Sequence, residues 1–213
     1  DEVDCFPDDP DAYPGAIEQP TNQQDDDCDG EIDEAPTSGV VINELSDGFA
    51  GSGQGRFVEL LNTSNNVVDL TGYKLIALEE SSIARSHTPI DSVLLAPGER
   101  HTLATDPSSV SGFGSRQLVP AQFLPNDNES LGITAALFDG MDQRQDLVGA
   151  GMQFGGESWF YANAMHPRYE GVGLPAAGDG FGTSVSRVPD GRDTGRNRDD
   201  FAQRPATSGS PNQ

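Results

Sequence analysis

The sequence has 213 residues and a formal net charge of −23, from 35 acidic and 12 basic residues. This length suits one large all-β domain, or one ordinary domain with a small appendage. The charge argues against nucleic acid and anionic membranes as partners, because both attract cationic surfaces. No apolar run approaches the ~18 residues of a spanning helix, so we also expect no membrane insertion.

The acidic residues are concentrated at the start of the chain. Residues 1–35, the acidic segment, contain 14 Asp or Glu and no Lys or Arg. The remaining residues contain 21 acids and 12 bases. Residues 36–39 have the composition of a short linker, and we assign residues 40–213 to the main domain. An acidic segment of this kind suits hard cations, although a disordered, solubilising tail is the alternative.

Both cysteines of the chain, Cys5 and Cys28, lie in the acidic segment. A disulfide between them would close a loop of roughly two dozen residues and contribute about 3 kcal/mol. The segment has too few apolar residues to fold by burial alone, so it needs such a bond. The disulfide requires an oxidising compartment, and two free thiols in a cytosolic protein are the alternative. We therefore expect an extracellular or cell-surface location, with a signal peptide removed.

Residues 40–213 alternate between short strand patterns and turns. The 25 Gly and 15 Pro of the sequence favour many turns and disfavour long helices. The expected strands are 40–45, 56–62, 67–70, 73–78, 92–95, 101–104, 117–119, 130–134, 136–138, 147–148 and 184–188. Their spacing of about 8–12 residues predicts an all-β sandwich or barrel. Residues 46–55 and 149–183 are expected to be long loops, the second partly packed on the sandwich.

The strongest chemical signal is an alternating run of carboxylates in the acidic segment. Asp25, Asp27 and Asp29 have the 1-3-5 spacing of an EF-hand calcium loop, and Gly30 falls at its sharp turn. Pro36 stands where an EF-hand has its bidentate Glu, so further ligands must come from elsewhere. The other predicted ligands of Ca²⁺ are Glu31 (through its carbonyl), Asp33, Glu34, Asp4, Asp8, Asp9 and Asp11.

The same stretch resembles a metal-binding motif of secreted bacterial proteins. The matching elements are Asp4-Cys5, Asp8-Asp9, Pro14-Gly15-Ala16-Ile17-Glu18, Asp27-Cys28-Asp29-Gly30 and Asp33-Glu34. The sequence departs from the motif at residues 19–24, where the family has another Cys and this chain has none. The resemblance implies calcium binding and export.

The rest of the chain resembles the lamin tail domain. The opening strands carry the resemblance, as do the turn at 96–99 and the stretch 186–194 near the C-terminus. Further matching elements are Asp199-Asp200-Phe201 and the residues 207–212. The resemblance spans residues 40–212 and implies an Ig-like β-sandwich.

No known catalytic pattern is present in the sequence. His87, His101 and His166 are far apart and lack metal-ligand spacing, so we expect a protein that is not an enzyme. Glu44 and Glu59 could form a carboxylate pair for a metal or for acid–base chemistry. The alternative is that they bind backbone amides or arginines.

These features favour a calcium-stabilised structural or interaction module on the outside of a bacterial cell. It would be an adhesin, a surface-fibre subunit or an attached module of an exported protein. Its expected partners are metal ions, other copies of itself, or surface proteins and glycans. The alternative is a carbohydrate- or protein-binding accessory domain of an exported hydrolase or nuclease. For that role the aromatic residues Trp159, Phe160 and Tyr161 are the candidates, unless they pack on the core.

Overall fold

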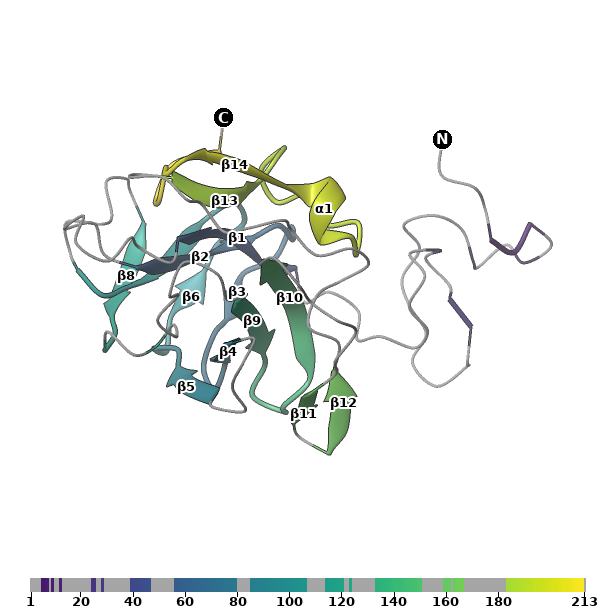
Figure 1. Ribbon diagram of the computed structural model, residues 1–213, viewed down its shortest axis with the longest axis horizontal. Coiled ribbons are helices and arrows are strands. Elements are labelled where there is room, and N and C mark those ends of the chain that lie inside the picture. Colours follow the sequence, from purple (N-terminus) through teal and green to yellow (C-terminus); the bar gives the residue numbers. More distant parts are fainter. Residues whose placement is uncertain are drawn as a thin grey trace.

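The fold is described from a computed structural model of the chain (Figure 1). The structure describes residues 5–7, 9, 12, 24–25, 28, 39–46, 56–79, 85–106, 114–120, 123, 133–150, 159–161, 163–166 and 183–212. The expected loop at 46–55 lies outside this part of the chain, apart from its first residue.

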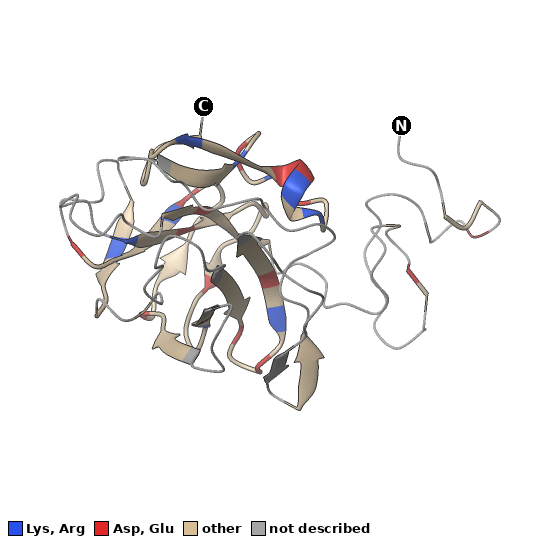
Figure 2. Cartoon of the chain, viewed as in Figure 1, with Lys and Arg blue, Asp and Glu red and all other residues tan. Residues whose placement is uncertain are grey.

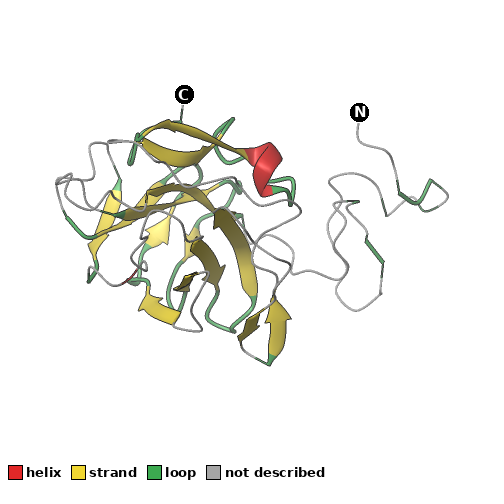
Figure 3. Ribbon diagram, viewed as in Figure 1, coloured by secondary structure: helices red, strands yellow, loops and turns green. Residues whose placement is uncertain are grey.

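Two sheets, both mainly antiparallel, form the body of the domain (Figure 3). The six-stranded sheet has the order β14-β13-β1-β2-β7-β8, and the four-stranded sheet has the order β10-β9-β4-β5. The first sheet contains β1 (Val40–Ser46), β2 (Phe57–Asn62), β7 (Arg100–Ala104), β8 (Ser115–Leu118), β13 (Thr183–Arg187) and β14 (Phe201–Pro205). The second contains β4 (Lys74–Glu79), β5 (Arg85–Pro89), β9 (Ile133–Phe138) and β10 (Arg144–Ala150). Among the described strands, only β7 and β8 pair in parallel.

Three small elements complete the described structure. The pair β3 (Val68–Asp69) and β6 (Leu94–Leu95) forms one ribbon, and the pair β11 (Trp159–Tyr161) and β12 (Ala164–His166) forms another. The helix α1 (Asn197–Asp200) has a single turn and leads directly into β14. No helix in the described ranges has the length and apolar character needed to cross a membrane.

The main hydrophobic core lies between the two sheets. Ile42 and Leu60 reach it from the six-stranded sheet, and Leu75 and Leu137 reach it from the four-stranded sheet. All four side chains are fully buried. This arrangement of two sheets around one apolar layer confirms the expected Ig-like β-sandwich.

Each sheet is also covered on its outer face. All six residues of β2 are buried, which differs from the alternating exposure of a strand with one solvated face. A second apolar cluster occupies the outer face of the four-stranded sheet and contains Ile76, Leu78, Ala136, Phe138 and Leu147. Tyr161 of β11 packs against this cluster.

Most of the expected strands are present, and the differences have local causes. The two strands expected at 130–134 and 136–138 are one strand, β9, because Ala135 continues the pairing with β4. Two strands of the sheets, β5 and β14, were not predicted. Both contain Arg and end in Pro, which weakens a strand pattern in the sequence. The expected loop at 149–183 contains the ribbon β11–β12.

Both sides of the sandwich are tied across by side chains. On one side, the bulge of β1 between Ile42 and Glu44 faces the bulge of β10 between Arg144 and Asp146. Asp146 accepts a hydrogen bond from the backbone N–H of Ile42 and so links β10 to the six-stranded sheet. A bulge leaves one backbone group of a strand without its ladder partner, and the carboxylate supplies that partner here.

On the other side, Gln117 of β8 links the six-stranded sheet to the end of β5. Its Nε2 donates to the carbonyl oxygen of Pro89 at 2.9 Å, and its Oε1 accepts from the N–H of Asp91 at 2.9 Å. We call this pair of bonds the amide clasp. The side-chain amide thus binds one backbone C=O and one backbone N–H at the end of β5, as the backbone of a neighbouring strand would do.

Candidate functional site

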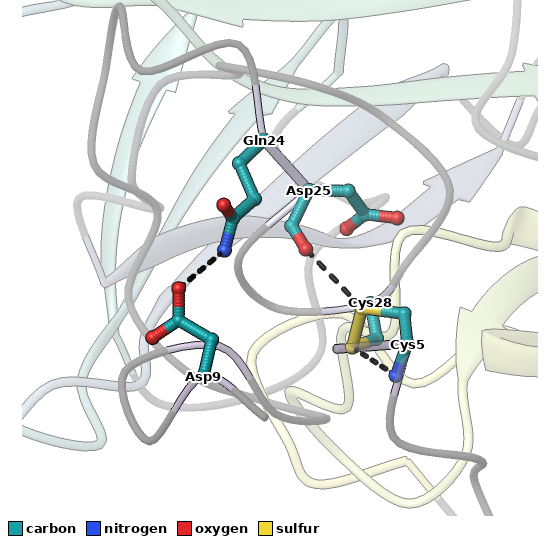
Figure 4. The surroundings of a disulfide bond; sticks show 5 residues. All are labelled: Cys5, Asp9, Gln24, Asp25 and Cys28. Atoms are coloured by element: carbon teal, nitrogen blue, oxygen red, sulfur yellow. Dashed lines mark hydrogen bonds between the residues drawn. A yellow bond between two sulfur atoms is a disulfide. The ribbon is translucent and has the colours of Figure 1, made fainter. Parts of the chain in front are cut away.

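The acidic segment contains the predicted disulfide. Cys5 and Cys28 are bonded, with their Cα atoms 5.5 Å apart and a sequence separation of 23 (Figure 4). This bond joins the first cluster of acids in the sequence to the second, because one cysteine lies in each cluster. The prediction of a disulfide is confirmed, and the alternative of two free thiols is wrong.

Short contacts surround the disulfide (Figure 4). The backbone N–H of Cys5 donates to Sγ of Cys28 at 3.0 Å. The Sγ atom of Cys5 lies 3.2 Å from the carbonyl oxygen of Asp25, without a shared proton because the disulfide has replaced the thiol hydrogen. Nε2 of Gln24 donates to Oδ2 of Asp9 at 3.0 Å. Three contacts besides the disulfide therefore join residues 5 and 9 to residues 24, 25 and 28.

Two of the predicted calcium ligands lie in the described structure, namely Asp9 and Asp25. The other eight fall outside the described residues: Asp4, Asp8, Asp11, Asp27, Asp29, Glu31, Asp33 and Glu34. Within the described ranges, no three His, Cys, Asp or Glu side chains gather as a metal site. The cysteines are bonded to each other, so the available donors are oxygens, which fit Ca²⁺ rather than a thiolate-bound metal.

Glu44 and Glu59 are partners across β1 and β2, and both are fully buried. Glu44 accepts hydrogen bonds from the hydroxyl of Ser184 and from the N–H of Thr207. Glu59 accepts hydrogen bonds from Nδ2 of Asn43, at 2.9 Å, and from the N–H of Gly209. Its Oε1 also lies 3.3 Å from Nε of Arg100. The structure therefore supports the second hypothesis for this pair, in which the carboxylates bind amides and an arginine.

Burial dominates the protonation of this carboxylate pair. It raises the pKa of Glu44, and it raises the pKa of Glu59 to about 7, against the opposing effect of the hydrogen bonds. The chain after β14 helps to bury the two glutamates. The N–H groups of Thr207 and Gly209 bind them, and Ser208, between these two residues in the sequence, is itself buried. The pair thus fixes the C-terminal stretch on the outer face of the six-stranded sheet.

A second buried ionic cluster centres on Arg187 of β13, and sequence reasoning missed it. Nη2 of Arg187 donates to both carboxylate oxygens of Asp146 at 2.9 Å, and Nε donates to the carbonyl oxygen of Ile42. Nη1 lies 3.1 Å from Asp193 and 3.4 Å from Asp200. We call this set of contacts the charged clasp. Burial raises the pKa of both Asp146 and Asp200.

The sequence contains only part of the signal for this cluster. The mixture of Arg and Asp between 187 and 204 predicts local pairing on a surface loop. That pairing is present for Arg187 with Asp193 and Asp200. However, Arg187 is fully buried, and its closest carboxylate is Asp146, which is 41 residues away in the sequence. Its guanidinium also stacks 4.5 Å above the ring centroid of Phe201, an arrangement that only the folded sheet creates.

The three candidate aromatic residues of the expected loop at 149–183, Trp159, Phe160 and Tyr161, lie in β11. Tyr161 packs edge-on against Phe138, with ring centroids 4.7 Å apart, and its hydroxyl donates to Asp142. For Tyr161, the hypothesis of packing on the sandwich is therefore confirmed. Trp159 and Phe160 pair with β12, and their side chains lie outside the described structure.

Comparison with known proteins agrees with this architecture. A search of curated proteins finds no match to the chain. Residues 33–151 match the family model of the Lamin Tail Domain. The matched region includes β1 to β10, whereas β13 and β14, which complete the six-stranded sheet, follow it. Because the match covers more than half of the sequence, the chain belongs to the lamin tail domain family.

Proposed function

We propose that this protein is a calcium-stabilised structural or interaction module on the outside of a bacterial cell. The disulfide between Cys5 and Cys28 is the observation that carries this proposal. Disulfide bonds persist in oxidising compartments, such as the outside of the cell, and are rare in the cytosol. The bond also holds together two clusters of like charge that would otherwise repel each other.

Calcium would relieve that repulsion. The carboxylates of Asp25, Asp27 and Asp29 and the carbonyl of Glu31 are the proposed core ligands, with Asp33, Glu34 and the upstream acids as further donors. Ca²⁺ takes six to eight oxygen ligands in flexible geometry, and extracellular modules bind it at 10⁻⁴–10⁻³ M. A ligand that binds only the folded form stabilises it by about 2.7 kcal/mol at a hundredfold excess over Kd.

A non-catalytic role is the second part of the proposal. The lamin tail domain is an Ig-like structural domain rather than a family of enzymes. The buried carboxylates of the domain are engaged in structure, because Glu44 and Glu59 accept hydrogen bonds from the backbone of 207–209. A general base must instead reach a substrate proton.

Calorimetric titration with CaCl₂ tests the metal site. The chelator-treated protein is titrated alongside a variant with Asp25→Asn and Asp27→Asn. A matched control carries Asp91→Asn and Asp199→Asn, two exposed acids of the main domain. We expect saturable calcium binding by the wild type and the control, with Kd near 10⁻⁴–10⁻³ M. The Asp25/Asp27 variant should bind on the order of tenfold more weakly, or not at all.

A disulfide-free variant, with Cys5→Ser and Cys28→Ser, tests the observation that carries the proposal. It should lose roughly tenfold or more in calcium affinity, because the two acid clusters must then be brought together on binding. A MgCl₂ titration shows whether the site selects the larger ion. Equal calcium affinity in the wild type and both variants would contradict a metal site in the acidic segment.

A further inference from the structure

Four exposed arginines lie along the β14 side of the six-stranded sheet, spread from the turn before α1 to the far end of β14. They belong to the turn before α1, to α1 itself and to the outer strand β14 (Figure 2). The four residues are Arg192, Arg196, Arg198 and Arg204, and we call them the arginine edge. A concentration of bases is unusual in a chain that has only 12 basic residues and a net charge of −23.

Two of these four arginines have a carboxylate within ion-pair distance. Arg192 lies 3.4 Å from the buried carboxylate of Asp200, and Arg196 lies 4.0 Å from the exposed carboxylate of Asp199. Within the described structure, neither Arg198 nor Arg204 has a carboxylate within ion-pair distance. Among the described residues of this edge, solvent therefore faces four guanidinium groups and the carboxylate of Asp199, which is about half exposed.

The strand that carries Arg204 is open on one side. The strand β14 pairs with β13 through contacts such as Arg204 with Ser184, and it is the last strand in the order of its sheet. Gln203, Arg204 and Pro205 are all exposed. Among the described residues nothing pairs with the far side of β14, so this edge is accessible to a second molecule.

We propose that the arginine edge of one copy binds the acidic segment of a second copy. This inference rests on the proposed function and names a partner for the module. The acidic segment has 14 carboxylates and no basic residue, so it is the part of the chain most complementary to the edge. A calcium ion bound to the segment neutralises only two of those charges. Head-to-tail contact of this kind joins copies into chains, because each copy keeps one free segment and one free edge.

Screening decides whether local attraction exceeds the general repulsion between two acidic molecules. The Debye length is about 8–10 Å at 0.10–0.15 M salt, so charges farther apart contribute little. The strength of the contact then depends mainly on the arginines and carboxylates that lie next to each other in it. The absence of alternating apolar residues in the segment favours this electrostatic docking over addition of a strand to β14.

Sedimentation velocity over a concentration series, in calcium and about 0.1 M NaCl, measures the association. We expect the wild type to form reversible dimers and longer species. Raising NaCl to about 0.5 M should weaken the association roughly tenfold, since the contact is exposed. A triple variant, with Arg196→Glu, Arg198→Glu and Arg204→Glu, should remain monomeric. Arg192 is kept in that variant because it lies next to Asp200.

A matched pair of single variants controls for the change in net charge. Arg198→Glu reverses one charge on the arginine edge. Arg116→Glu reverses one exposed charge on β8, the opposite outer strand of the same sheet. Association should weaken in the first variant and stay at the wild-type level in the second. Equal effects would show that only the net charge matters, and would overturn the proposal.

Mixing separates binding between copies from binding within one copy. The triple arginine variant retains its acidic segment, and a variant with Asp25→Asn, Asp26→Asn, Asp27→Asn and Asp29→Asn retains its arginine edge. Each should be monomeric alone, and the mixture should form a complex of the two. A monomeric wild type or a monomeric mixture overturns this inference. The calcium titration of the triple variant should stay as in the wild type, so that a failure of docking is distinguishable from a failure of the proposed calcium site.

Discussion

The two sides of the sandwich are closed by opposite chemistries. At β10 the charged clasp uses a fully buried guanidinium and the carboxylate of Asp146. At β5 the amide clasp uses the neutral side chain of Gln117, which is only partly buried. Buried charges lose their hydration and depend on every partner, whereas a neutral amide near solvent can exchange its partners for water. The charged side should therefore be fixed in one geometry, and the amide side should tolerate change.

The largest effect is expected from Arg187→Met. Removing the guanidinium leaves Asp146 and Asp200 buried without their cation, so the free energy of unfolding should fall by about 3–5 kcal/mol. Urea denaturation followed by tryptophan fluorescence measures this loss. The double variant Arg187→Met with Asp146→Leu should recover part of it, because an apolar pair avoids the unpaired charge. Strictly additive losses would contradict the charged clasp as a coupled unit.

The next effect is a dependence of stability on pH that runs opposite to ordinary acid denaturation. Burial raises the pKa of Glu59 from 4.5 to about 7 in the folded protein. Between these values the folded state holds a proton that the unfolded chain has released. The contribution of Glu59 to the free energy of unfolding should therefore be fully present below pH 4.5, and should fall on the order of 2 kcal/mol as the pH rises towards 7. The raised pKa values of Glu44, Asp146 and Asp200 act in the same direction.

Urea denaturation at a series of pH values tests this dependence. Glu59→Gln removes the titrating group, so the slope of unfolding free energy against pH should become shallower in that variant. The slope is the readout rather than the stability itself, because the amide cannot accept from the N–H of Gly209 in the same way. A wild-type protein that becomes steadily more stable from pH 5 to pH 7 would refute the assignment. The neutral amide clasp should contribute nothing to the slope.

The smallest effect is expected from Gln117→Leu. This change removes two hydrogen bonds, but water can replace them at the partly exposed groups of Pro89 and Asp91. We expect a loss of about 1 kcal/mol in the free energy of unfolding, measured under the same conditions as Arg187→Met. Asp91→Asn is the matched control, since it keeps the backbone N–H that Gln117 binds. A loss as large as that of Arg187→Met would remove the contrast between the two sides.

Local patterns in the sequence predicted most of the strands. The β-branched run at 40–45 and the alternating run at 56–62 became β1 and β2, because apolar spacing and turn residues act within a few positions. The turn at Pro189-Asp190-Gly191 has residue types that are typical of turns. Gly191 has a φ of +72°, and a Cβ atom there would lie 2.6 Å from Thr63. Only glycine fits such a close approach.

By itself, the sequence determined the fold class and the pairing of Cys5 with Cys28. Each follows from local composition, spacing or the simple count of two cysteines. Only the tertiary structure decided that Arg187 would be buried against Asp146 and that Glu44 and Glu59 would hold the C-terminal stretch. These contacts join residues from 41 to 163 positions apart. Their energies depend on desolvation and geometry that exist only after the sheets have packed together.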